Sequence, residues 1–187
     1  VCSSDLLAGK DAKLDTLNVS LGASTTSVDL NARLLGPGAS SNMLGLYFGD
    51  GRQHFDHNTS QDHLAPSAKS DLLYKGALDG SSRSVFRGII RVARGAQQTD
   101  AYQTNRNMVL SEGARADSLP KLEIEADDVK CSHGATVGHL DEEALFYLMS
   151  RGISRNQAER LVVLGFLGEV LQRLPLGGVV DRKSTRL

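Results

Sequence analysis

The chain has 187 residues, in which 21 Lys and Arg against 22 Asp and Glu leave a formal net charge of -1. Hydrophobic residues make up 40% and charged residues 23%, which is typical of a single globular domain and excludes wholesale disorder. The apolar runs are too short to cross a bilayer and Lys and Arg form no cluster, so we expect neither a membrane nor a nucleic acid as partner.

The two ends differ from the rest of the chain. Residues 1–6 and 181–187 resemble the translated read-through of a sequencing adapter, one end in each orientation, and are excluded from fold prediction. Residues 7–180 are then expected to be an interior piece of a longer gene. Because Cys2 lies in the excluded residues 1–6, Cys131 is the one thiol considered for a chemical role. A reducing compartment is expected.

Apolar residues recur with period two over residues 13–126, which is typical of β-strands. The clearest run is Val28, Leu30, Ala32 and Leu34, and Leu44, Leu46 and Phe48 repeat it. Further strands are predicted at 71–77, 84–92, 103–110 and 121–126, separated by turns such as Asp50-Gly51 and Asp79-Gly80. Many short strands fit a sandwich, a barrel or a β-helix, and no strict short repeat distinguishes them.

After Gly138 the pattern becomes helical. Asp141 is predicted to cap a helix that Gly152 ends, and Ser154 with Gln157 has the form of a capping box for a second helix. The second helix carries an apolar stripe of Ala158, Leu161, Val162, Gly165, Phe166, Val170 and Leu174, and Pro175 with Gly177 and Gly178 ends it. We interpret the stripe mainly as a surface for internal packing, with room for a partner on another face.

This layout predicts a β-rich body over 7–138 and a C-terminal helical region over 139–180, mainly β and α+β overall.

Cys131 and His133 form the first candidate site. They follow the predicted strand 121–126 at a strand-to-turn boundary, and extended geometry would put both side chains on one face. Thiolate and imidazole are ligands that iron and zinc prefer, and the pair could also serve nucleophilic sulfur chemistry. The alternative is a buried small cysteine beside a polar turn residue.

A second cluster contains His54, His57 and His63, which would suit an autonomous His-rich metal-binding domain. On a strand, however, His54 and His57 would face opposite sides, and their spacing matches no compact zinc pattern. We therefore favour a solvated, polar strand edge. Asp127 and Asp128 would also project to opposite faces, which excludes a catalytic carboxylate pair and indicates solvent-facing turn residues.

The sequence contains no Gly-x-x-x-x-Gly-Lys-Ser/Thr loop, no Gly-x-Gly-x-x-Gly motif opening a helix and no Gly-x-Ser-x-Gly elbow. We expect no nucleotide hydrolysis by this chain, so any ATP used belongs to a partner. A β-helix enzyme acting on polysaccharide is the alternative from another class. It would need several carboxylates or basic groups that converge on one groove.

The segment LEIEADDVKCSHGATVG at residues 122–138 resembles the SufB/SufD family of iron–sulfur cluster assembly proteins, and more closely its SufD than its SufB branch. The resemblance continues over 141–153 and upstream at 86–88, 99–100 and 103–105, and covers almost the whole chain between the adapter-like ends. It implies a right-handed parallel β-helix core followed by a C-terminal helical region.

The resemblance also implies a function, that of a non-catalytic scaffold subunit in the cytoplasm. SufB members carry a Cys thought to receive sulfur in the stretch that matches 103–108, where Asn105 stands here. His133 is implied at the SufB interface, near the site of nascent cluster formation, as an iron ligand or proton-transfer group, with Cys131 the weaker candidate.

Two partners are implied. SufB would pair through the β-helix core, and the ATPase SufC would dock on the helical region, within residues 144–174. We expect the chain alone to bind no cofactor tightly, and iron or an iron–sulfur cluster to be held transiently with SufB.

Overall fold

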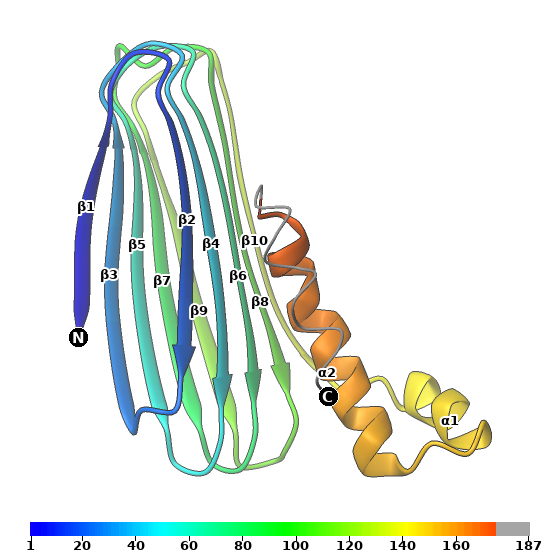
Figure 1. Cartoon of the computed structure of the whole chain (residues 1–187). Helices are drawn as coiled ribbons and strands as arrows, with labels where there is room; N and C mark the ends of the chain where they lie inside the picture. Colours follow the sequence, from blue (N-terminus) through cyan, green and yellow to red (C-terminus); the bar gives the residue numbers. More distant parts are fainter. Residues whose placement is uncertain (175–187) are drawn as a thin grey trace.

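The computed structural model describes residues 1–174, which form ten strands followed by two helices (Figure 1). The elements are β1 Cys2–Ala8, β2 Lys13–Leu21, β3 Thr25–Leu34, β4 Ser40–Gly49, β5 His54–His63, β6 Lys69–Leu78, β7 Arg83–Val92, β8 Thr99–Val109, β9 Arg115–Ile124, β10 Val129–His139, α1 Glu142–Ser150 and α2 Arg155–Gln172. None of these helices is both long and apolar enough to cross a membrane. The predicted stop at Pro175, Gly177 and Gly178 and the adapter-like residues 181–187 lie outside the described residues.

The strands alternate between two parallel sheets. The odd sheet has the order β1-β3-β5-β7-β9 and the even sheet the order β10-β8-β6-β4-β2. Because consecutive strands never pair within one sheet, each coil of the chain adds one parallel strand to both sheets. This is a parallel β-helix followed by two helices, which confirms the mainly β fold that the resemblance implies and excludes the sandwich and the barrel.

The coil length varies along the helix, which explains why no short repeat is visible. Thr25 pairs with His54 and His54 with Arg83, a step of 29 residues each time. Arg83 pairs with Arg115, a step of 32 residues. The turns nevertheless stack: Gly80, with a φ of 64°, lies so close to the backbone of the previous turn that a Cβ there would approach it to 2.9 Å. Only glycine fits both constraints.

The core lies between the two sheets, where alternate residues of each strand point inward. Its largest fully buried side chains are aromatic: Tyr47, Phe55, Tyr74 and Phe86. Polar side chains share this interior. Tyr47 donates a hydrogen bond to Asn107, whose Nδ2 donates to Asn105 Oδ1 at 2.8 Å. The interior therefore contains buried hydrogen-bonded networks as well as apolar packing.

Both predicted helix starts are confirmed. Asp141 accepts hydrogen bonds from the backbone of Glu143 and Ala144, and Ser154 forms a capping box with Gln157. The C-terminal half of α2 packs on the outer face of the even sheet, where Val170 contacts a cluster with Leu44, Leu46 and Leu73. The predicted packing stripe is only partly correct, because Leu161 is 49% exposed.

Candidate functional site

The last coil of the β-helix, made of β9 and β10, carries Cys131 and His133. Both residues lie inside β10 rather than at the strand-to-turn boundary predicted from the sequence. Their register partners in β8 are Ala101 and Gln103, which are buried in the interior. Alternation along the strands therefore places Cys131 and His133 on the inner face, as the prediction of a shared face requires.

Cys131 is half-buried and makes apolar contacts. It packs against a cluster that includes Ile90, Val92 and Ala101. Burial raises the pKa of its thiol, with a smaller contribution from the nearby Asp100 carboxylate, so the thiol stays protonated at neutral pH. A protonated, half-buried thiol is a poor metal ligand and a poor nucleophile.

His133 is exposed on the same face, and β10 is the edge strand of the even sheet within residues 1–174. β10 pairs only with β8, so its other edge offers free backbone donors and acceptors among the described residues. An exposed imidazole can coordinate a metal ion or transfer a proton. His133 therefore fits a role toward a ligand at this end of the β-helix better than Cys131 does.

Asn105 lies one step further along the inner face, opposite Ala135 in register. It is 1% exposed, donates to the Tyr74 carbonyl oxygen at 3.3 Å and accepts from Asn107. Its amide is thus engaged in the interior network. This residue contributes to the fold and has no free group to offer a substrate.

The histidine cluster is not a metal site in the structure, and the predicted solvated strand edge is wrong. His57 and His63 are fully buried in the interior, whereas His54 is half-buried. His57 Nε2 lies 3.2 Å from Ser20 Oγ, and His63 Nε2 lies 2.8 Å from Ser70 Oγ. Residues 1–174 contain no group of three metal-ligating side chains.

Desolvation explains the state of the two buried histidines. It lowers the pKa of His57 and of His63 to about 4, despite the opposing effect of the adjacent carboxylates Asp56 and Asp62. Both imidazoles are therefore neutral at pH 7. Asp127 and Asp128 are exposed residues of the turn between β9 and β10, as predicted.

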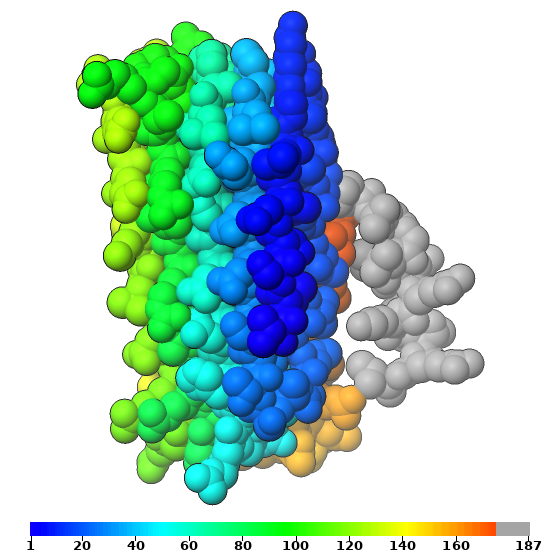
Figure 2. Space-filling view, turned by 90° about the vertical axis from the view of Figure 1, so that its left-hand side faces the viewer, coloured from blue at the N-terminus to red at the C-terminus, as the bar shows by residue number. Residues whose placement is uncertain are grey.

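A groove of about 420 Å³ crosses the outer face of the odd sheet, the broad face seen in Figure 2. Its cationic lining residues are Arg87, Arg91 and Lys121. Arg87 is paired with Asp56 at 2.6 Å and Arg91 with Glu123 at 3.1 Å. The described lining residues include no Asp or Glu, and the carboxylates next to the groove are those that pair with its arginines.

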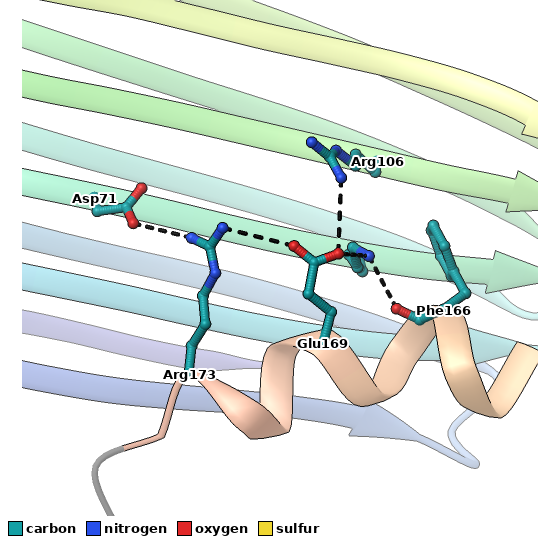
Figure 3. Close-up of polar contacts among 6 residues, drawn as sticks. Asp71, Arg106, Phe166, Glu169 and Arg173 are labelled. Atoms are coloured by element: carbon teal, nitrogen blue, oxygen red, sulfur yellow. Dashed lines mark hydrogen bonds and ion pairs between the residues drawn. The ribbon is translucent and has the colours of Figure 1, made fainter.

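A charged cluster joins α2 to the even sheet (Figure 3). Lys75 of β6 is 3% exposed, donates to the Phe166 carbonyl oxygen at 3.0 Å and pairs with Glu169. Glu169 also lies 3.7 Å from Arg106 and 3.6 Å from Arg173. The hydrogen bond from Lys75 is the main reason that the pKa of Glu169 is lowered. Sequence analysis missed this cluster, whose one visible signal is a lysine in an apolar strand.

A family model described as SUF system FeS cluster assembly, SufBD core domain, matches residues 1–166. The chain belongs to the SufBD core family. The match covers the whole β-helix, α1 and most of α2, so the candidate site on β10 lies within the SufBD core.

Individual proteins of the SufBD family are also similar to this chain in sequence. An iron-sulfur cluster assembly SufBD family protein of Mycobacterium leprae is 45% identical over 184 residues, which cover 94% of this chain and 47% of that protein. SufD of Escherichia coli is 34% identical over 98% of this chain and 43% of its own length. SufD of Bacillus subtilis is 36% identical over 91% of this chain and 39% of its own length. The chain spans less than half the length of these relatives.

Proposed function

We propose that this SufBD core belongs to a SufD-like, non-catalytic scaffold subunit that assembles iron–sulfur clusters together with SufB and SufC in the cytoplasm. In this proposal His133 forms one wall of a site shared with SufB, and iron or the nascent cluster is the cargo of that site. Cys131 is the weaker candidate, since its thiol is half-buried and protonated.

The exposure of His133 on the last coil carries this proposal. Within the part of the chain that the structure describes, β10 has one edge without a paired strand, along which a second β-helix can pair, and His133 lies on the inner face of this strand. A subunit bound there would bring its own side chains next to the imidazole. Asn105, at the position of the sulfur-accepting Cys of SufB members, has no thiol, so the thiolate in this proposal comes from SufB.

The two C-terminal helices support the proposal that SufC is the second partner. α1 contacts α2, and large apolar side chains of both helices are exposed: Phe146, Tyr147, Met149, Leu161 and Leu164. We place SufC on this surface. The sequence contains no phosphate-binding loop, so ATP hydrolysis belongs to SufC in this scheme.

Substituting His133→Ala in the full-length protein tests the proposal. We expect cluster formation with SufB and SufC to fall at least tenfold, measured by the visible absorbance of the reconstituted cluster. The matched control is Ser132→Ala, because Ser132 is also exposed but points to the opposite face of β10. Cluster formation that is unchanged in His133→Ala would contradict the role of this residue.

A further inference from the structure

Gln103 of β8 is a fully buried side chain whose polar atoms have no hydrogen-bond partner among residues 1–174. It is 1% exposed, and neither its Nε2 nor its Oε1 makes a hydrogen bond. Leaving a buried amide unpaired is unfavourable, so such a group is retained for a reason or satisfied by a ligand. Other buried amides of β8, those of Asn105 and Asn107, are paired.

The fold makes room for this carboxamide at one place in the odd sheet. A Cβ on Gly88 of β7 would lie 2.4 Å from Gln103 Nε2 and 2.6 Å from Oε1. Any side chain at Gly88 would therefore displace the amide. The missing side chain lets Gln103 extend across the interior until its carboxamide lies against the β7 backbone.

The neighbours of this amide in the last coil are His133 and Pro120. Pro120 of β9 pairs with Gly88 in register and has neither an N–H nor a polar side chain. His133 of β10 pairs with Gln103 itself and lies on the same inner face. Of these two residues, His133 is the one with a polar side chain.

We propose that Gln103 is the positioning residue for His133, an inference that rests on the function proposed above. Its Oε1 accepts the N–H of one ring nitrogen once a partner covers this end of the β-helix. The second ring nitrogen then presents its lone pair to a divalent cation of the ferrous type at the interface. A histidine that binds metal is commonly oriented in this way, by a carbonyl or carboxylate oxygen that accepts its other N–H.

Two substitutions separate positioning from packing. Gln103→Met keeps the length and volume of the side chain but removes the acceptor, whereas Gln103→Glu keeps an acceptor oxygen. Because Gln103→Met also removes an unpaired buried amide, we expect it to leave the urea midpoint of the full-length protein unchanged or higher. A purely structural role for the amide predicts a lower midpoint instead.

The main measurement is the ring tautomer of His133 in the complex of the full-length protein with SufB and SufC. In this complex, only the SufD-like subunit is labelled with ¹⁵N-histidine, and spectra are recorded at pH 8.5. The signal of His133 is the one that disappears in His133→Ala. We expect one dominant tautomer in the wild type, a mixture in Gln103→Met and the single tautomer again in Gln103→Glu. Equal tautomer ratios in the wild type and Gln103→Met would overturn the inference.

Binding of Co²⁺ to the same complexes, as a probe for ferrous iron, gives a second readout. We expect Gln103→Met to weaken the His133-dependent binding by about 10- to 100-fold and Gln103→Glu to retain it. Unweakened binding in Gln103→Met would overturn the inference. Failure of the proposed function is seen separately: His133→Ala would then leave cluster formation intact, whatever the tautomer and Co²⁺ results for Gln103.

Discussion

At the scale of single residues, the buried histidines contribute to the pH dependence of the stability of this SufBD core. Burial lowers the pKa of His57 and His63 to about 4, whereas a histidine in an unfolded chain has a pKa of about 6.5. Between these two pH values the unfolded chain binds more protons than the folded chain. The free energy of unfolding therefore falls as the pH falls from about 6.5 towards 4.

We expect His57→Gln to reduce this pH dependence. A pKa change of this size corresponds to on the order of 3 kcal/mol, so the loss of stability between pH 7.5 and pH 4.5 should shrink by up to about that amount. Urea unfolding of the full-length protein at both pH values measures it. His54→Gln is the matched control, because His54 lies on the same strand but is only half-buried. An equal loss of unfolding free energy between these pH values in His57→Gln and the wild type would contradict the prediction.

The sequence predicted the shared face of Cys131 and His133 correctly and the environment of His57 and His63 wrongly. The shared face follows from alternation along one strand, which depends on neighbouring residues alone. His57 and His63 were placed on a solvated edge because polar residues dominate β5, and polar strands are usually exposed. Inside this β-helix, hydrogen bonds across the interior from one sheet to the other, such as Gln61 to Ser70, offset that burial. Such pairs become visible only when the register is known.

At the scale of elements, α2 is held on the even sheet by both apolar and charged contacts. Lys75 is almost completely buried, and Glu169 is its acidic partner. The Lys75 ammonium also lies 4.3 Å from the centre of the Phe166 ring. Removing the carboxylate would leave the ammonium buried with only a carbonyl oxygen and an aromatic face, which is unfavourable for a charge.

We therefore expect Glu169→Ala to destabilise the docking of α2 more than Lys75→Met does. The effect should be about 2 kcal/mol for Glu169→Ala, less than for a fully buried pair because Glu169 is 37% exposed. Lys75→Met keeps the apolar stem and removes the charge, so its effect should be smaller. Hydrogen exchange of the α2 amides in the full-length protein measures both.

The control for this prediction is Glu142→Ala, which removes an exposed partner of Arg155 at 2.8 Å. Solvent screens this pair, so exchange at the C-terminal half of α2 should not change. Faster exchange in Lys75→Met than in Glu169→Ala would contradict the prediction, because it would show that losing the Lys75 charge costs more than leaving the ammonium unpaired.

Local signals predicted the elements better than long-range ones. Both helix caps were correct, because a cap depends on a few neighbouring residues. The strand predicted at 121–126 begins at Arg115 in the structure, since Ser118 and Pro120 interrupt the apolar alternation. β10 was missed as a strand, because its inner face is not covered and needs no apolar pattern.

At the scale of the whole molecule, the two proposed partner surfaces lie on different faces of the even sheet. His133 lies on the inner face at the last coil. α2 packs on the outer face against β4 and β6, and Figure 1 shows it beside the stack of strands. The backbone of the sheet separates them. Binding of SufC and cluster formation with SufB should therefore be separable by substitution.

We expect the double variant Phe146→Ala and Leu161→Ala to weaken SufC binding by tenfold or more, because exposed apolar anchors contribute most of the affinity of such interfaces. Phe146 is 73% and Leu161 49% exposed, so the fold should tolerate both changes. Leu119→Ala is the control, since Leu119 is 51% exposed on the odd sheet, away from the helices. Calorimetric titration with SufC measures the affinity, and His133→Ala should leave it unchanged. If the double variant bound SufC normally, or if His133→Ala lost SufC, one surface would have to serve both partners and the separation by the even sheet would be wrong.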